Sequence, residues 1–293
     1  MSIFGFISQY EKTRSNLEER FLSYYQYNIK ILFFRIYIRF KYSLIIKLKL
    51  YSIIKNILFI STDIETYGYC NRSCEFCFNN PKFEQREKGI MPEEMWKNII
   101  DELSCLKYKG RISPHFYGEP LLDNRLPDLI SYGRKKCPRA YILIDTNGDL
   151  LDETIIRKLY SSGVNKLFVT SYDASIPDRL LSLRDKYPAI VRVRSVQDFN
   201  KVNRSGKIFD KKKKLKKVCL NPSFQLVINW QGDVLLCCMD YYKEVSFGNV
   251  GTSSIANIWL SEKFAYVRRS LRIAQRETIP ICKYCDHEGD VPW

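Results

Sequence analysis

The sequence predicts an α/β protein with an incomplete parallel β/α barrel, followed by a smaller C-terminal subdomain. Short apolar runs alternate with helical patterns from residue 58 to about residue 200. Strands that alternate with helices in this way indicate right-handed βαβ units and a parallel sheet. The units are too few for a complete eight-fold barrel. After residue 218 the pattern changes to a β-hairpin and helices, which predicts a separate C-terminal element.

The predicted strands and helices of the barrel alternate regularly. The helix after the first strand opens with Pro92, Glu93 and Glu94, and proline and acidic residues favour the first turn of a helix. Pro114 is an irregularity in the second strand. The strands are expected at residues 58–66, 111–117, 140–145, 166–171 and 189–196, and the helices at 92–109, 125–137, 152–162 and 176–187.

Residues 1–57 form a segment with its own composition. Its only acids lie near its start, and further on Lys and Arg alternate with Ile, Leu, Phe and Tyr. No apolar run approaches the ~20 residues that a membrane-spanning helix needs. Two interpretations remain. The segment is either a basic amphipathic element on an anionic membrane surface, or a basic helical extension that packs on the barrel.

Composition limits the location and the partners. The formal charge of +15 favours anionic partners such as nucleotide-linked substrates, nucleic acid or an anionic membrane surface. The N-terminus has no pattern of a secretory signal, so we expect a cytoplasmic protein, with peripheral contact at the inner membrane face as a further hypothesis. In a reducing compartment, ten grouped cysteines indicate metal ligands rather than disulfides.

Three cysteines follow the first predicted strand at the spacing C-x3-C-x2-C. They are Cys70, Cys74 and Cys77, with Phe76 just before the last. Thiolates in so short a loop can converge on one centre, and sulfur ligands favour iron–sulfur clusters, zinc or Cu(I). A closed zinc site or an electron-transfer cluster normally has four protein ligands. Three ligands on a cubane would leave one iron open to another molecule.

This loop resembles the cluster motif of the radical S-adenosylmethionine (SAM) superfamily. The resemblance implies a partial (β/α)6 barrel of the TIM type, consistent with the strand count. It also implies that Cys70, Cys74 and Cys77 hold a 4Fe-4S cluster whose fourth iron is chelated by SAM. Phe76 would then lie beside the adenine.

Three further stretches at predicted strand ends strengthen the resemblance. Gly118 and Glu119 follow the second strand and resemble the family's Gly-Gly-Glu-Pro motif, which accepts hydrogen bonds from the SAM ammonium; Tyr117 replaces the first glycine. Asn147 follows the third strand in a turn like the one beside the ligand. Ser171 ends the fourth strand and resembles a residue that bonds the SAM carboxylate or ribose. Chemistry in barrel enzymes gathers at these strand ends.

A second group of cysteines lies in the C-terminal part. The hairpin predicted at residues 224–229 and 234–236 would bring Cys237 close to Cys219, and Cys282-x2-Cys285 follows after two helices, expected at residues 254–259 and 261–276. Zinc is the generic alternative for such a set. The arrangement resembles the twitch subdomain, the short form of the SPASM domain, which implies one auxiliary 4Fe-4S cluster. We expect Cys238 to point away from the set.

The order of these features predicts four regions. Residues 201–217, which link the barrel to the C-terminal subdomain, are strongly basic. They form either a solvated loop or an anion-binding lip over the site. Arg204 in this linker precedes the first auxiliary cysteine by about the interval at which cyclitol-oxidising members of the twitch group carry a substrate-contacting arginine. His115 and His287 are read as structural. The regions are a basic N-terminal extension (1–57), the radical SAM partial barrel (58–200), a basic linker (201–217) and the auxiliary-cluster subdomain (218–293).

The resemblance implies a radical oxidoreductase. SAM would be cleaved to a 5′-deoxyadenosyl radical that abstracts a substrate hydrogen, and the auxiliary cluster would accept an electron. The favoured substrate is a hydroxyl-bearing carbohydrate, cyclitol or nucleotide-linked sugar, with flavodoxin or ferredoxin as electron donor and no nucleic acid. The alternatives are a peptide-modifying SPASM enzyme and a non-enzymatic zinc- or nucleic-acid-binding protein.

Overall fold

The computed structural model describes residues 59–289, except residues 84, 199–201 and 210–214. The chain divides into two units, Met1–Ile57 and Leu58–Trp293, and the described residues belong to the second. The predicted N-terminal extension with its membrane contact, and the densest part of the basic linker, therefore lie outside the described residues. Among the helices that are described, none is both long and apolar enough to cross a bilayer.

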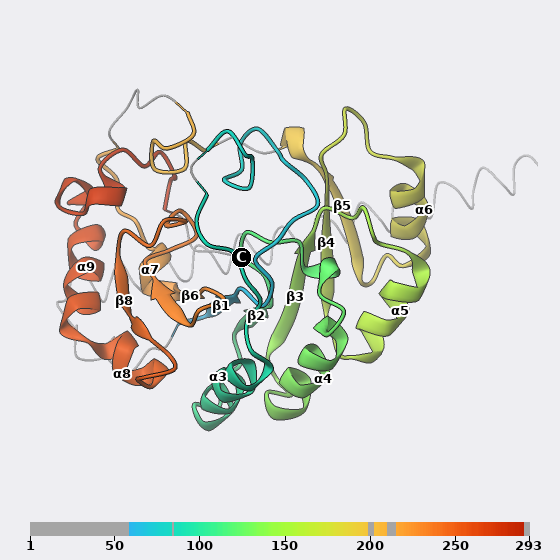
Figure 1. The fold of residues 1–293 in the computed structure, drawn as a ribbon, viewed down its shortest axis with the longest axis horizontal. Helices are drawn as coiled ribbons and strands as arrows, with labels where there is room; N and C mark the ends of the chain where they lie inside the picture. Colours follow the sequence, from blue (N-terminus) through green and yellow to red (C-terminus); the bar gives the residue numbers. More distant parts are fainter. Residues whose placement is uncertain (1–58, 84, 199–201, 210–214, 290–293) are drawn as a thin grey trace, which may run out of the picture. The chain divides into compact units, whose positions relative to one another are not determined.

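One eight-stranded sheet organises the described chain, with the order β5-β4-β3-β2-β1-β6-β7-β8 (Figure 1). The strands β1 to β6 are parallel to one another, and the pairs β6–β7 and β7–β8 are antiparallel. Their bounds are β1 Ser61–Ile64, β2 Arg111–Ser113, β3 Tyr141–Thr146, β4 Lys166–Ser171, β5 Val191–Ser195, β6 Gln225–Ile228, β7 Asp233–Leu235 and β8 Ser246–Asn249.

Four helices connect the first five strands, as the alternation predicts. In the first of them, α3, the buried residues Trp96, Ile99, Ile100 and Leu103 recur at the spacing of one helical face. The second strand ends at Ser113, directly before the irregular Pro114. The connecting helices are α3 Glu93–Cys105, α4 Leu126–Lys136, α5 Glu153–Ser161 and α6 Asp178–Lys186.

The six-unit barrel is not confirmed in detail. Five strands and four connecting helices precede the linker, and the sixth parallel strand, β6, comes from the C-terminal region and pairs with β1. The predicted hairpin is confirmed as the antiparallel pair β6–β7, with Gly232 at φ +87° in its turn. The hairpin therefore continues the barrel sheet. All four residues of β1 and of β6 are buried, so this pairing lies inside the core.

The rest of the C-terminal region packs beside this hairpin. It holds the helices α7 Asn221–Phe224, α8 Ile255–Leu260 and α9 Glu262–Arg272. One apolar cluster joins residues of β1, α3, β6 and β7 to residues of α8 and α9, including Ile64, Trp96, Leu226 and Phe264. The barrel and the auxiliary region thus share one core, which fixes the position of one relative to the other.

Candidate active site

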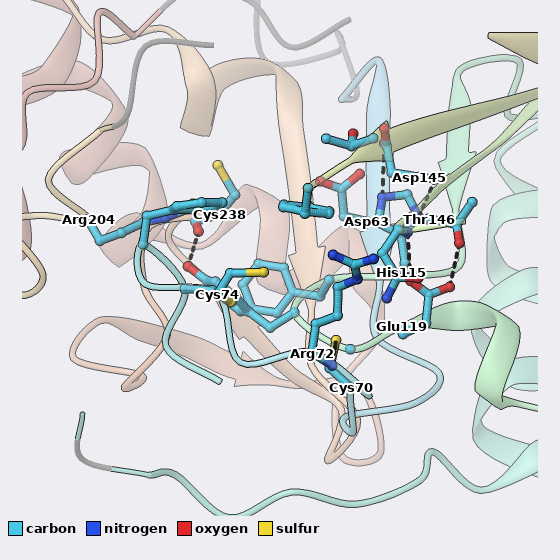
Figure 2. A pocket seen from close by; sticks show the side chains of 18 of the residues that line it. Asp63, Cys70, Arg72, Cys74, His115, Glu119, Asp145, Thr146, Arg204 and Cys238 are labelled. Atoms are coloured by element: carbon cyan, nitrogen blue, oxygen red, sulfur yellow. Dashed lines mark hydrogen bonds and ion pairs between the residues drawn. The ribbon is translucent and has the colours of Figure 1, made fainter. Parts of the chain in front are cut away.

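A cavity of about 280 Å³ lies where the carboxyl ends of β1 to β4 meet the cysteine loop (Figure 2). The loops after these strands supply most of its wall, Arg194 of β5 contributes to it, and the chain after β5 supplies two residues, Arg204 and Cys238. The predicted residues that line it are Cys70, Cys74, Phe76, Cys77, Gly118, Glu119, Asn147 and Arg204. The structure therefore brings together all the residues predicted for the first site except Ser171.

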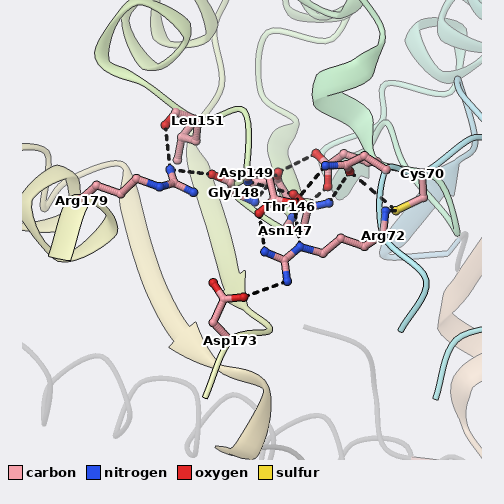
Figure 3. A network of polar contacts seen from close by, with 11 residues as sticks. Cys70, Arg72, Thr146, Asn147, Gly148, Asp149, Leu151, Asp173 and Arg179 are labelled. Atoms are coloured by element: carbon pink, nitrogen blue, oxygen red, sulfur yellow. Dashed lines mark hydrogen bonds and ion pairs between the residues drawn. The ribbon is translucent and has the colours of Figure 1, made fainter. Parts of the chain in front are cut away.

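Ion pairs and hydrogen bonds hold the cysteine loop against the loops after β3 and β4 (Figure 3). Arg72 donates to Asp149 from Nε at 2.7 Å and from Nη2 at 2.5 Å, and reaches Asp173 at 3.2 Å. Asn71 also donates to Asp149, at 2.9 Å. Burial, with the nearby Cys77 and Cys70, raises the pKa of the Cys74 thiol to about 11. The Cys74 thiol thus carries a proton at neutral pH and must release it to bind a cluster.

Glu119 ties the second strand end to the third. Its carboxylate accepts the Thr146 hydroxyl at 2.6 Å and the backbone N–H groups of Asn147 at 2.8 Å and Leu121 at 3.1 Å. Burial raises the pKa of this carboxyl group, and the three donors act against that rise. An ammonium beside it would favour the ionised form further. Glu119 is thus already engaged within the protein, and only part of its accepting capacity is left for a ligand.

The turn after β3 is fixed to the cysteine loop by Asn147. Its side-chain amide donates to Asn71 at 2.7 Å, and its Oδ1 accepts the backbone N–H of Asp149 at 2.9 Å. Arg179 on α6 supports the turn from behind, because it donates to the carbonyl of Gly148 at 2.9 Å. The turn signal in the sequence therefore corresponds to a rigid loop that packs on the cluster motif.

Two aromatic rings separate the cavity from an adjoining groove. Phe76 and Tyr172 stack with centroids 5.9 Å apart and planes at 18°, and both line the cavity and the groove. The groove continues to Val196 and Gln197 beyond β5. A flat, apolar adenine would match such a ring surface. Ser171 is buried but is not among the lining residues, while its neighbours Thr170 and Tyr172 are.

A contact between His115 and Asp145 in the cavity wall was not predicted from the sequence. His115 lines the cavity, and its Nε2 lies 3.2 Å from Asp145 Oδ2. Arg194 holds the other oxygen of Asp145 at 2.6 Å. Burial acts to raise the pKa of Asp145, but His115 and Arg194 outweigh it and hold the pKa below its usual value. A lone histidine in the sequence does not reveal this contact, because its partner Asp145 lies on the next strand, β3.

The four predicted auxiliary cysteines lie together in the C-terminal half. Cys237, Cys282 and Cys285 belong to one buried cluster, and Cys219 packs against it. Burial raises the pKa of Cys237, and the nearby Cys238, Cys282, Cys285 and Cys219 add to the rise. Cys238 instead lines the first cavity, as predicted, although β7 ends at Leu235 and strand alternation does not extend to residue 238. Thiols lose their protons when they bind a metal centre, which also removes the repulsion between neighbouring thiolates. A buried group of thiols therefore suits a cluster with several thiolate ligands.

Arg276 fastens the two chain segments that carry these cysteines. It is 2% exposed and donates to backbone carbonyls on both sides of the site, with the shortest contacts 2.8 Å to Lys217 and 2.8 Å to His287. Longer contacts of 3.4 Å reach Val218, Cys285 and Glu288. The planar guanidinium fork thus joins the approach to Cys219 to the Cys282–Cys285 loop.

We expect Arg276→Lys to lose the auxiliary cluster. An ammonium cannot reach the carbonyls of both segments at once, so Cys219 would separate from the other three ligands. Iron in anaerobically reconstituted protein should fall from about eight to about four per chain, since each cubane holds four irons. The exposed Arg157→Lys is the matched control and should retain all the iron. Full iron in the Arg276 variant would contradict the assigned role.

Arg204 and Tyr117 join the first cavity to the auxiliary half. The Arg204 guanidinium lies over the Tyr117 ring at 5.7 Å, and the Tyr117 hydroxyl donates to the Cys238 carbonyl at 2.5 Å. Within the described chain, no carboxylate lies at ion-pair distance from Arg204, and its Nε has no hydrogen-bond partner. A partly buried guanidinium without an acidic partner is a candidate contact for a ligand.

Both cysteine groups fit iron–sulfur clusters. Among the described residues, no three His, Cys, Asp or Glu side chains are close enough to hold one metal ion. Three thiols with an open cavity beside them also suit a cluster that binds a further ligand.

Comparisons with known proteins decide the family. A model described as the radical SAM superfamily matches residues 64–200, and one for SPASM, an iron–sulfur cluster-binding domain, matches residues 219–286. The chain is 32% identical over 237 residues to the S-adenosyl-L-methionine-dependent 2-deoxy-scyllo-inosamine dehydrogenase of Niallia circulans, covering 78% of this chain and 94% of that protein. The chain belongs to the radical SAM superfamily. Its SPASM domain provides the second cluster site.

Solved structures agree with this assignment. BtrN in complex with AdoMet and 2-DOIA has a TM-score of 0.73 at 32% identity, covering 79% of this chain and 94% of that chain. Native anSMEcpe with bound AdoMet shares the fold at a TM-score of 0.52 and 15% identity, covering 77% of this chain and 89% of that chain.

The PqqA peptide cyclase of Granulibacter bethesdensis is 31% identical over 36% of this chain and 27% of its own length.

The main predictions about chemistry are thus confirmed. The protein is a radical SAM oxidoreductase with SAM and two 4Fe-4S clusters as cofactors, not a non-enzymatic zinc- or nucleic-acid-binding protein. A small-molecule substrate is consistent with the dehydrogenase relative. The individual cluster ligands and SAM-contact residues remain predictions. Those predicted for the first site line one cavity, except for Ser171. Ser171 is the member whose position offers the least support for a contact.

Proposed function

We propose that the protein oxidises a hydroxyl group of a small polyhydroxylated substrate to a carbonyl group. The substrate class is a carbohydrate, a cyclitol or a nucleotide-linked sugar. The observation that carries the proposal is the position of Arg204, whose guanidinium faces the same cavity as the cysteine loop and lacks an acidic partner within the described chain. The extended similarity to a cyclitol dehydrogenase supports the same substrate class.

The cofactors would supply the radical chemistry. When bound, SAM and the first cluster, held by Cys70, Cys74 and Cys77, would supply a 5′-deoxyadenosyl radical for hydrogen-atom abstraction. Oxidation of the hydroxyl-bearing carbon to a ketone would also release one electron and one proton, and the auxiliary cluster would supply the electron acceptor. Cysteine at all four auxiliary positions leaves no open iron there, which suits electron transfer rather than substrate binding.

The protein side chains would orient the substrate and receive the proton. Arg204 keeps its own proton, so it can donate a hydrogen bond to the substrate oxygen and stabilise negative charge on it. His115 lies in the wall of the same cavity, with its Nε2 3.2 Å from the Asp145 carboxylate. Its Nδ1 accepts the backbone N–H of Asp145 at 3.5 Å, a long contact that a substrate hydroxyl would replace, and an imidazole nitrogen in that position would act as a general base. We therefore assign polarisation of the hydroxyl to Arg204 and acceptance of its proton to His115.

The electron donor and the location are part of the same proposal. A flavodoxin or a ferredoxin would reduce the first cluster, because SAM cleavage requires a low-potential electron. Peripheral contact of residues 1–57 with an anionic membrane and a cytoplasmic location remain predictions that rest on the sequence. Co-sedimentation of the full chain with phosphatidylserine vesicles, compared with phosphatidylcholine vesicles, tests the membrane contact. Failure to sediment with the phosphatidylserine vesicles would contradict it.

An isotope-transfer assay tests the reaction. Reconstituted protein is incubated with SAM, dithionite and substrates that carry deuterium at the hydroxyl-bearing carbon, including 2-deoxy-scyllo-inosamine, other cyclitols and nucleotide-linked sugars. We expect deuterium in 5′-deoxyadenosine and a ketone in equal amounts. His115→Gln should reduce the rate of ketone formation by a larger factor than it reduces SAM cleavage that is not coupled to substrate oxidation. Deuterium transfer without ketone, or stimulation by peptides alone, would contradict the proposed function.

A further inference from the structure

Arg204 lies on a turn with an unusual backbone conformation. Three consecutive residues have positive φ, namely Arg204 at 48°, Ser205 at 59° and Gly206 at 74°. The left-handed region is unfavourable for residues with a Cβ, and such a conformation persists only where the surrounding structure enforces it. The turn is part of the linker, outside any helix or strand. Specific contacts must therefore hold it.

Those contacts come from the loop that carries two auxiliary cysteines. The backbone N–H of Asn203 donates to both oxygens of Asp286, at 2.9 and 3.0 Å, and its side-chain amide donates to the carbonyl of Tyr284 at 2.8 Å. Its Oδ1 accepts the backbone N–H of Gly206 at 3.0 Å. We call this set of contacts the Asn203–Asp286 clasp. Asn203 is 4% exposed, so the clasp is shielded from water.

The side chain of Arg204 has few contacts of its own. Its Nη1 lies 3.9 Å from the sulfur of Met239, and the guanidinium lies over the Tyr117 ring at 5.7 Å. These are weak, poorly directional contacts. The direction in which the guanidinium enters the cavity is therefore set mainly by the backbone turn, and the turn is set by the clasp.

We propose that the auxiliary cysteine loop positions Arg204 for the substrate through the Asn203–Asp286 clasp. The auxiliary site then has a positioning role in addition to electron acceptance. Asp286 directly follows Cys285, so a cluster that fixes Cys282 and Cys285 also fixes the acceptor of the clasp. This inference rests on the proposed function for the identity of the ligand that meets Arg204. The coupling between the loop and the turn does not depend on that ligand.

Hydrogen exchange of the reconstituted full chain without substrate tests the coupling. In Asn203→Ala, the amides of residues 203–208 should exchange about tenfold faster or more, because a lost hydrogen bond corresponds to about 1.4 kcal/mol. Asn249→Ala is the matched control, since that side chain also joins two segments of the C-terminal half, at 2.9 Å to Gln231 and 2.9 Å to Asp233. It should leave residues 203–208 unchanged. Exchange like that of the wild type in Asn203→Ala would overturn the proposal.

Two variants of Asp286 separate hydrogen bonding from general loosening. Asp286→Ala removes the acceptor of the clasp, whereas Asp286→Asn retains one oxygen that can accept the Asn203 N–H. With 2-deoxy-scyllo-inosamine or the best cyclitol from the isotope assay, KM should rise about tenfold in Asp286→Ala and stay near the wild-type value in Asp286→Asn. Iron should remain at about eight per chain in both.

The outcomes separate the positioning role from the proposed function. An unchanged KM in Asp286→Ala, with full iron, would overturn the positioning role and leave hydroxyl oxidation intact. If the wild type oxidises no hydroxyl compound, the proposed function fails, and the exchange result still decides whether the auxiliary loop holds the turn.

Discussion

Replacing Cys70, Cys74 and Cys77 together by Ala should abolish the formation of 5′-deoxyadenosine from SAM. The three thiols line one cavity and supply the ligands predicted for the first cluster. Iron in the anaerobically reconstituted variant should fall from about eight to about four per chain, because only the auxiliary cubane remains. We expect no cleavage above background, since no other described cysteine group opens onto the residues predicted to hold SAM. Iron, acid-labile sulfide and 5′-deoxyadenosine are measured after addition of SAM and dithionite.

Cys105→Ala provides the matched control for this experiment. Cys105 is exposed at the end of α3 and belongs to neither cysteine group, so both iron content and cleavage should match the wild type. About four irons in an active wild type would mean that the C-terminal cysteines hold no 4Fe-4S cluster. Hydroxyl oxidation would then lack its electron acceptor. Zinc in place of iron, without cleavage, would contradict the radical chemistry altogether.

The barrel elements were predictable because their signals are local. The helix predicted at residues 125–137 is α4, Leu126–Lys136, and the strand predicted at 166–171 is β4 over the same residues. Apolar periodicity within a segment, and Pro or Gly near its ends, identify such helices and strands from neighbouring residues alone. The C-x3-C-x2-C spacing of Cys70, Cys74 and Cys77 is local in the same sense, whereas the auxiliary cysteines are spread from Cys219 to Cys285. Both sets remain predicted cluster ligands.

The remaining features depend on partners that are distant in the sequence. The pairing of β6 with β1 joins Gln225 to Ser61, and no short window contains both. Arg276 is one of many basic residues, and its role follows only from carbonyls at both edges of the auxiliary site. Asn203 has no motif at all, because its partner Asp286 is defined by the folded loop. The sequence predicts the cluster ligands, and the structure adds the residues that hold the segments carrying them.

Gly118→Ala should disrupt the SAM site severely, although it adds only one methyl group. A Cβ at residue 118 would lie 1.8 Å from the carbonyl oxygen of Tyr67 and 3.0 Å from that of Tyr69. Neither backbone can retreat easily. The Tyr69 carbonyl accepts the N–H of Glu119 at 2.8 Å, and Tyr67 pairs with Ile90 in an antiparallel bridge. The substitution must therefore separate the Gly118-Glu119 segment from the start of the cysteine loop.

The expected result is a loss of SAM affinity of about tenfold or more, because overpacking of this kind typically costs about 1–3 kcal/mol. Equilibrium binding of SAM to the reconstituted protein measures it, and thermal unfolding should show a lower Tm. Gly133→Ala is the control, since a Cβ there meets only side-chain atoms, at 3.7 Å from Trp96 and 3.8 Å from Ile100, inside α4. Alanine is favoured over glycine in a helix by about 1 kcal/mol, so that variant should be slightly stabilised. Equal SAM binding by both variants would show that the close approach of Gly118 to Tyr67 is not what shapes the site.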